Sequence, residues 1–190
     1  MKDIVSLIYG DSIVYGIGDQ EYFGWVNRVK FNLENNKNNY IFNLGIPGQN
    51  STDILNRFEN ELKSRFNKED VFNLIFSFGI KDTLLYNEDK NYLNVFKDNI
   101  KNIISISKKY SKNIYFIGLI IPDISIRTNY NIDNVLLFDN ELENICNENS
   151  VNYIRIRDLI NKDDLFDGLH PNNNGHKKIS EFIIQNIFEN

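Results

Sequence analysis

Cysteine is almost absent from this chain, since Cys146 is the only one among 190 residues. No internal disulfide can form, which suits a reducing compartment. We interpret Cys146 as a half-buried helix residue and not as a nucleophile. The sequence also has no Cys/His cluster and no H-E-x-x-H pattern, so it predicts neither a metal ion nor another cofactor.

Long hydrophobic runs and an excess of positive charge are missing as well. No stretch approaches the roughly 20 apolar residues of a membrane-spanning helix. The apolar run at residues 4–9 is too short for a signal peptide, and no cleavage pattern follows it. These absences predict a soluble, cytoplasmic protein. The net charge of -5 and the pI of about 5.1 argue against a nucleic-acid partner, because no basic stripe could neutralise phosphates.

The chain does contain enough apolar residues to form a substantial core. Its 190 residues are 42% hydrophobic and 13% aromatic, which suits one domain over residues 1–190. Five segments read as strands, mostly as continuous apolar runs that suit strands covered on both faces. These segments are residues 4–9, 40–44, 71–78, 114–121 and 151–156.

Between the strands, apolar residues recur every three or four positions, as on the buried face of a helix. The helical patterns comprise Trp25, Val29 and Leu33; Ile54, Leu55, Phe58 and Leu62; Leu93, Phe96, Ile100, Ile103 and Ser107; Phe138, Leu142 and Ile145; and Ile179, Ile183 and Ile187. Ser51 or Thr52 is the expected N-cap of the second helix. The polar segments 86–90 and 122–134 are expected to be loops at the rim of a pocket.

Alternating strands and helices favour right-handed βαβ crossovers and a parallel sheet. The sequence therefore predicts an α/β fold, a three-layer α/β/α sandwich around a five-stranded parallel sheet, flavodoxin-like in arrangement. In such folds, functional residues gather on the loops that follow the carboxyl ends of the strands.

Two of these loops carry groups suited to nucleophilic catalysis. Ser12 follows the first strand in Tyr9-Gly10-Asp11-Ser12, and Asp167-Gly168-Leu169-His170 follows the last. A serine hydroxyl is a poor nucleophile at neutral pH and needs a base within hydrogen-bond reach. Asp167 stands three residues before His170, a spacing that lets its carboxylate fold back and fix the imidazole tautomer. The sequence therefore predicts a serine hydrolase.

Two further loops support this interpretation through a resemblance. After the second strand comes Asn43-Leu44-Gly45-Ile46-Pro47-Gly48-Gln49-Asn50-Ser51, and after the third comes Phe78-Gly79-Ile80-Lys81-Asp82. In this order the four loops resemble those of the SGNH (GDSL-type) hydrolases, a family of esterases and acylhydrolases. The resemblance extends over nearly the whole chain and implies the SGNH hydrolase fold.

The resemblance also implies roles for single residues. Ser12 matches the family nucleophile, His170 the general base, and Asp167 its partner. Gly48 matches the glycine whose backbone N–H serves the oxyanion hole, together with the N–H of Ser12. Lys81 falls where the family's glycine-any-asparagine-aspartate motif has its asparagine, so it departs from the pattern at a functional position.

Lys81 leaves three interpretations open. It substitutes for the asparagine as a charged donor, it turns aside to pair with Asp82 or another carboxylate, or the protein is catalytically weak and acts by binding. One well-placed donor to an oxyanion is worth on the order of 10²–10³ in turnover. Lysine has N–H donors and a favourable charge, but its side chain is longer and more flexible than that of asparagine.

Other residues near these motifs have structural interpretations. His176 is an alternative base, which we interpret as a packing or capping residue, and Asp11 is expected to hold backbone amides of its loop. A nucleotide-binding loop at residues 10–18 is discounted because the G-x-x-x-x-G-K-[ST] pattern is missing. An α/β-hydrolase is set aside because Ser12 lies in no G-x-S-x-G elbow.

The main hypothesis from the sequence is a serine esterase that cleaves small carboxylic esters through an acyl-enzyme on Ser12. The first alternative is deacetylation of a sugar or glycan, which exposed aromatics such as Tyr15, Tyr22 or Trp25 would support. For Trp25 and its neighbours we prefer the interpretation as a hydrophobic helix face. The second alternative is a binding module that lost efficient chemistry, and Lys81 is its only support in the sequence.

Overall fold

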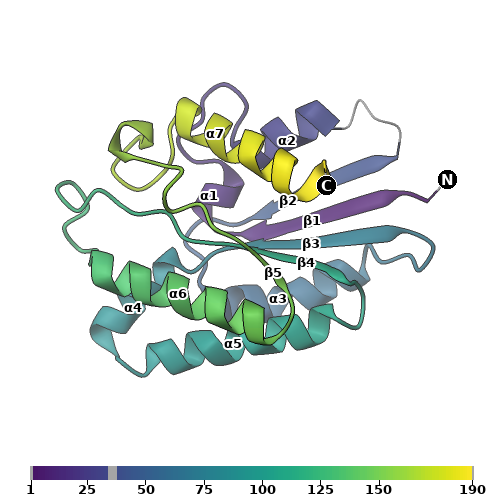
Figure 1. The fold of residues 1–190 in the computed structure, drawn as a ribbon, viewed down its shortest axis with the longest axis horizontal. Helices are drawn as coiled ribbons and strands as arrows, with labels where there is room; N and C mark the ends of the chain where they lie inside the picture. The colour runs from purple at the N-terminus through teal and green to yellow at the C-terminus, as the bar shows by residue number, and fades with distance from the viewer. Residues whose placement is uncertain (1, 34–37, 190) are drawn as a thin grey trace.

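The computed structural model describes residues 2–33 and 38–189. Strands and helices alternate along the chain (Figure 1). The elements are β1 (Ile4–Gly10), α1 (Ser12–Tyr15), α2 (Trp25–Leu33), β2 (Asn39–Gly45), α3 (Ser51–Lys63), β3 (Val71–Ser77), α4 (Ile80–Glu88), α5 (Tyr92–Ser107), β4 (Asn113–Ile117), α6 (Ile132–Glu148), β5 (Asn152–Ile154), the short 3-10 helix η1 (Lys162–Asp164), α7 (Asn173–Ile183) and the π-helical turn η2 (Ile184–Phe188).

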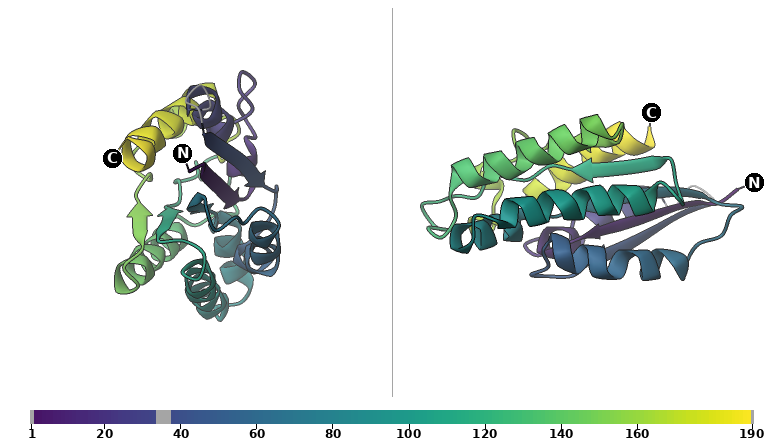
Figure 2. Two further views of the ribbon diagram at one scale, coloured as in Figure 1. Left: turned by 90° about the vertical axis from the view of Figure 1, so that its right-hand side faces the viewer. Right: turned by 90° about the horizontal axis from the view of Figure 1, so that it is seen from below.

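The five strands form one parallel sheet in the order β2-β1-β3-β4-β5. Helices α1, α2 and α7 cover one face, and α3 to α6 cover the other (Figure 1). The end-on view at the left of Figure 2 shows the same separation. The α/β/α sandwich expected from the sequence is therefore confirmed. In the described part of the chain, no helix has the length and apolar character needed to cross a membrane.

Each face of the sheet has its own apolar core, because successive side chains of a strand point to opposite faces. On β1, Leu7 and Tyr9 pack with α3 to α6, whereas Ile8 packs with α1, α2 and α7. On β3, Phe76 packs with α3 to α6, and Ile75 packs with α1, α2 and α7. Burial on both faces explains why these strands read as continuous apolar runs.

Three of the expected strands are shorter than the sequence suggested, β3 by one residue and the last two by more. The expected strand at residues 114–121 ends at Ile117, because the N–H of Leu119 donates to Asp139 Oδ1 of α6 at 2.8 Å and not to a neighbouring strand. The expected strand at 151–156 is β5, only Asn152–Ile154. The N–H of Val151 bonds back to Cys146 at the end of α6, at 2.9 Å.

Helix starts also differ from the expectation. Asn50, not Ser51 or Thr52, is the N-cap of α3, and its side chain accepts from the N–H groups of Thr52 and Asp53 in a capping box. Most of the polar segment 86–90, expected to be a loop, belongs to α4. The segment 122–134 is a loop until α6 begins at Ile132.

An aromatic cluster lies at the centre of the core between the sheet and α3. The Phe76 ring stacks on Tyr9 and on Phe116, with centroids 5.4 and 4.9 Å apart, and meets Phe58 edge-on at 5.6 Å. These side chains are fully buried. Phe76 therefore joins three strands and a helix.

We predict that Phe76→Ala destabilises the fold by about 3–5 kcal/mol, since it leaves a cavity among closely packed rings. Urea unfolding followed by circular dichroism measures the change. The matched control is Phe166→Ala, because Phe166 is 59% exposed and its loss should cost less than about 0.5 kcal/mol. Equal losses in the two variants would contradict this account of the core.

Candidate active site

Ser12 opens the short helix α1, directly after β1 ends. The carboxylate of Asp11 caps this helix and accepts from the N–H of Ile13 at 2.9 Å. The helix lies tightly against two strand ends, because a Cβ on Gly10 would meet Val14 Cγ2 at 2.2 Å and a Cβ on Gly45 would meet the backbone of Tyr15 at 2.3 Å. The two glycines thus let the serine sit directly on the edge of the sheet.

Asp167 and His170 lie on the loop between η1 and α7. One oxygen of Asp167, Oδ1, accepts from the N–H groups of Leu169 and His170 at 3.1 and 2.9 Å. Gly168 between them adopts a φ of +81°, a left-handed conformation that glycine allows. The loop therefore folds the carboxylate back towards the imidazole three residues later.

The structure brings the three predicted residues together in one chain of hydrogen bonds. Ser12 Oγ lies 2.9 Å from His170 Nε2, and His170 Nδ1 lies 2.9 Å from Asp167 Oδ2. Ser12 and His170 are 158 residues apart in the sequence. A neutral ring with its proton on Nδ1 donates to the carboxylate and leaves Nε2 to accept a hydrogen bond from the Ser12 hydroxyl.

Asp167 is held in its ionised form. Partial burial disfavours its charge, but hydrogen bonds from the backbone and ring of His170 outweigh burial and lower the pKa of Asp167 to about 2. At neutral pH the carboxylate is therefore charged and able to stabilise an imidazolium.

Arg127 also contacts Asp167, which the sequence analysis missed. Its Nε donates to the backbone oxygen of Asp167 at 2.9 Å, and its Nη2 forms an ion pair with Oδ2. Arg127 lies in the loop between β4 and α6, 40 residues before its partner. No local pattern joins the two residues, and only the general expectation that residues 122–134 line the rim pointed to this loop.

Gly48 and Lys81 lie on the loops that follow β2 and β3. Gly48 has a φ of +80° and an exposed position, with no other group within 4 Å of a Cβ built on it. The N–H of Ile46 in the same loop donates to Gly10 at 3.0 Å, which ties this loop to the end of β1. Lys81 is the second residue of α4 and is exposed.

Lys81 does not pair with Asp82, so that specific interpretation is wrong. Asp82 is fully buried, and its carboxylate accepts from Ser51 Oγ at 2.5 Å and from the Ser51 N–H. In the residues that the structure describes, the Lys81 side chain makes no hydrogen bond or ion pair. The Asp82 carboxylate instead ties the start of α4 to the start of α3.

Comparison with protein families identifies the family of this chain. The model of the GDSL-like lipase/acylhydrolase family matches residues 8–178. The chain belongs to this family. The match includes all five predicted site residues, Ser12, Gly48, Lys81, Asp167 and His170. No curated protein matches the sequence.

Solved structures share the fold of this GDSL-like protein at low sequence identity. A lipolytic G-D-S-L family member from Veillonella parvula is 16% identical, with a TM-score of 0.80 and 98% of each chain covered. The psychrotrophic esterase EstA from Pseudoalteromonas sp. is 20% identical, with a TM-score of 0.77 and 97% of each chain covered. Axe2, an acetylxylan esterase from Geobacillus stearothermophilus, is 18% identical, with a TM-score of 0.75, covering 97% of this chain and 94% of Axe2.

Several residues of the GDSL-like domain have the structural roles expected for them. His176 is fully buried in α7, where Nδ1 lies 3.1 Å from the N–H of Trp25 and Nε2 lies 3.0 Å from the oxygen of Ile17. Burial lowers the pKa of His176, so the ring is neutral and packs as a structural group. Cys146 is fully and not half buried, and burial raises its pKa to about 12.

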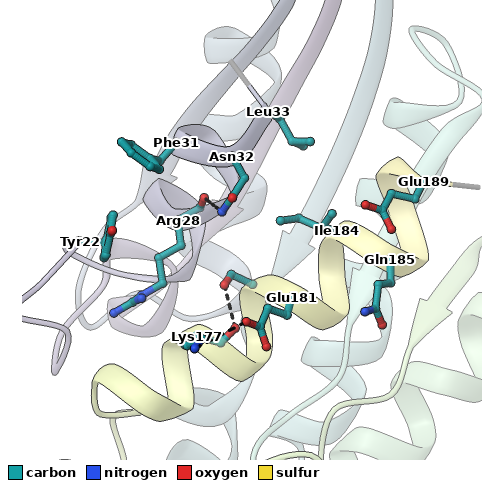
Figure 3. A pocket seen from close by; sticks show the side chains of 11 residues that line it. Tyr22, Arg28, Phe31, Asn32, Leu33, Lys177, Glu181, Ile184, Gln185 and Glu189 are labelled. Atoms are coloured by element: carbon teal, nitrogen blue, oxygen red, sulfur yellow. Dashed lines mark hydrogen bonds and ion pairs between the residues drawn. The ribbon is translucent and has the colours of Figure 1, made fainter. Parts of the chain in front are cut away.

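The three candidate aromatics do not form one surface. Trp25 is 1% exposed and belongs to the core, so it cannot serve as an exposed sugar platform. Tyr22 lies over the guanidinium of Arg28, 4.5 Å away, and lines a depression of about 570 Å³ between α2 and α7 (Figure 3). The residues that line this depression include none of the Ser12 site. Tyr15, in the helix of Ser12, is 56% exposed.

Metal ligands do not converge on this site. Within residues 2–33 and 38–189, no group of three or more His, Cys, Asp and Glu side chains could hold a metal ion.

We predict that Asp82 makes the stability of the fold depend on pH. Burial raises its pKa from 3.8 to about 7 against the hydrogen bonds from Ser51. Between these two pH values the folded state binds more protons than the unfolded state, so the free energy of unfolding falls as pH rises. At about 1.4 kcal/mol per pH unit, the loss reaches at most about 4 kcal/mol.

Urea unfolding of the wild type and of Asp82→Asn at pH 4.5 and 7.5 measures this effect. Asparagine keeps an acceptor for Ser51 but cannot ionise. We expect the wild type to lose stability relative to the variant as pH rises. Asp11, whose pKa burial raises to about 6, also raises the pKa of Asp82 through its charge, so the difference between the two proteins includes the interaction of these two carboxyls. A difference that stays constant between the two pH values would refute the prediction.

Proposed function

We propose that this protein is a serine esterase that cleaves carboxylic esters through an acyl-enzyme on Ser12. The observation that carries the proposal is the hydrogen-bonded chain from Ser12 Oγ to His170 and Asp167, with both links at 2.9 Å. Membership of the GDSL-like lipase/acylhydrolase family supports the same class of reaction.

The proposed reaction has two steps. His170 Nε2 takes the proton of the Ser12 hydroxyl while Oγ attacks the ester carbonyl, and Asp167 stabilises the imidazolium that forms. The imidazolium then gives its proton to the alkoxide that leaves, so an alcohol departs and an acyl-enzyme remains. In the second step water loses a proton to His170 and attacks the acyl-enzyme; the bond to Ser12 Oγ then breaks, the imidazolium returns its proton to Oγ, and the acid is released.

The negative charge that develops on the carbonyl oxygen during the attack needs hydrogen-bond donors that have no other acceptor. In the described part of the chain, neither the N–H of Ser12 nor that of Gly48 donates to another group. Both are therefore free to bind the oxyanion. We assign the Lys81 side chain as the third, charged donor, because among the described residues it has neither a carboxylate partner nor another hydrogen bond.

A second candidate function is removal of acetyl groups from a sugar or glycan at the same site. The exposed ring of Tyr15, three residues after Ser12 in α1, favours it, since aromatic rings offer sugars a flat apolar surface. The fold also matches Axe2, an acetylxylan esterase. A binding module without catalysis is the remaining alternative.

We predict that Ser12→Ala abolishes hydrolysis of p-nitrophenyl acetate and butyrate, with a loss of at least about 10³-fold in kcat/KM. The release of p-nitrophenol measures the rate. The physical reason is that no other hydroxyl lies at His170 Nε2 among the described residues. A panel of acetylated xylooligosaccharides, assayed for free acetate, separates the esterase from the deacetylase.

Equal rates in the wild type and Ser12→Ala, on esters and acetylated sugars alike, would overturn the esterase proposal. A serine-directed phosphonate then distinguishes the binding module, because a protein without an activated serine is not labelled. His176→Gln serves as the histidine control, and we expect it to alter stability more than the chemistry.

We predict that Lys81→Asn preserves or raises esterase turnover, since asparagine restores the family's donor at that position. The kcat on p-nitrophenyl acetate measures the effect. The matched control is Lys81→Ala, which removes the donor altogether and should lower kcat on the order of 10²-fold. If Lys81→Asn lowers kcat more than about tenfold, which is about 1.4 kcal/mol in barrier, the lysine charge has a specific role.

A further inference from the structure

We propose that Arg127 is a positioning residue that fixes the Asp167 carboxylate and keeps His170 able to accept a proton at lower pH. The inference rests on the proposed function for its role in catalysis. Its physical content, an interaction between Arg127 and the Asp167–His170 pair, can be tested without any substrate.

The contacts place Arg127 on the same oxygen that faces the imidazole. Asp167 Oδ2 interacts with both His170 Nδ1 and Arg127 Nη2, while Oδ1 takes the two backbone N–H groups. Arg127 Nε also holds the backbone oxygen of the same residue, at 2.9 Å. The guanidinium thus grips the aspartate at two points, which fixes its orientation better than a single contact would.

The loop of Arg127 is itself anchored on the loop of Asp167. The N–H of Asp123 donates to the oxygen of Gly168 at 2.8 Å, and the N–H of Arg127 donates to the oxygen of Asp123 at 2.8 Å. The Asp123 side chain accepts from Ser125 and pairs with Lys162 at 2.9 Å. The backbone around Arg127 is therefore held in a hydrogen-bonded turn, and Arg127 is not a freely moving surface residue.

The position of the charge has an electrostatic consequence. Asp167 stabilises the imidazolium through Oδ2, and a cation on the same oxygen offsets part of that stabilisation. The imidazolium is also repelled by the guanidinium directly. Removing the positive charge should therefore make His170 easier to protonate, so that the acidic limb of the rate profile moves to higher pH.

Other titratable groups near the Asp167–His170 pair are common to all the variants compared. Asp11 lies on the loop after β1, His176 on α7, and Tyr130 on the loop that precedes α6. Burial and the charges of Asp11 and Asp167 raise the pKa of Tyr130 to about 12, against the effect of Arg127, which lowers it. Asp11 titrates near pH 6, so variants must be compared with the wild type over the same pH series.

The test uses Arg127→Gln and Arg127→Lys in the full chain, with kcat/KM on p-nitrophenyl acetate measured from pH 4.5 to 9. For Arg127→Gln we expect the midpoint of the acidic limb to rise by about 0.5–1 pH unit. Arg127→Lys keeps the charge but loses the two-point grip, so its midpoint should stay within about 0.3 unit of the wild type while its plateau rate falls.

Arg155→Gln is the matched control, because Arg155 pairs with Glu143 in an ion pair that does not include the site. Its midpoint and plateau should match those of the wild type. A purely structural role for Arg127 would instead lower the plateau in both Arg127 variants with no change of midpoint. If Arg127→Gln does not fold, judged by circular dichroism, Arg127→Met keeps the aliphatic stem and carries the same test.

A proton NMR titration separates this inference from the esterase proposal. The chain has only two histidines, His170 and His176, and a His170→Gln spectrum assigns them. The His170 ring should titrate at higher pH in Arg127→Gln than in the wild type, even if no ester is cleaved. An unchanged His170 titration would overturn the inference, whereas a shifted one in an inactive protein would overturn only the esterase proposal.

Discussion

The candidate active site depends on three neighbouring parallel strands that end at the same position along the sheet. Gly10 of β1 lies between Gly45 of β2 and Ser77 of β3 in the register of the sheet. The loops that follow therefore leave from one line, and each carries one of the predicted site residues: Ser12, Gly48 or Lys81. Because the register is fixed by apolar side chains that must face one core or the other, the packing of the sheet also fixes where these three loops begin.

The two oxygens of the Asp167 carboxylate have different partners, and this difference sets the electrostatics of the site. One oxygen is held by backbone N–H groups, and the other is shared between an imidazole and a guanidinium. The first oxygen secures the loop, and the second contacts both the Arg127 guanidinium and the His170 ring. The surroundings of His170 thus include a residue from the loop that follows β4, whereas Ser12 follows β1 and Asp167 follows β5.

The sheet, its flanking helices and the Ser12–His170–Asp167 set could be predicted from the sequence, because each has a local signature. Apolar runs mark strands buried on both faces, and Asp167 stands three residues before His170. Contacts that depend on long loops could not be predicted. Arg127 meets Asp167 across 40 residues, and Asp82 meets Ser51 across 31. Even the N-cap at Asn50 was displaced by one residue, because Ser51 turns inward to the buried carboxylate.

The large separation between nucleophile and base has a consequence for synthesis. Ser12 opens α1 near the start of the chain, and His170 follows 158 residues later. A nascent chain therefore carries Ser12 without its hydrogen-bond partner until the segment that leads into α7 has been added and docked. Since α7 packs against α2 on the same face as α1, its docking completes this core and brings His170 to Ser12 at the same time. Under the proposed function, Ser12 therefore becomes reactive only once the segment that carries His170 has folded into place.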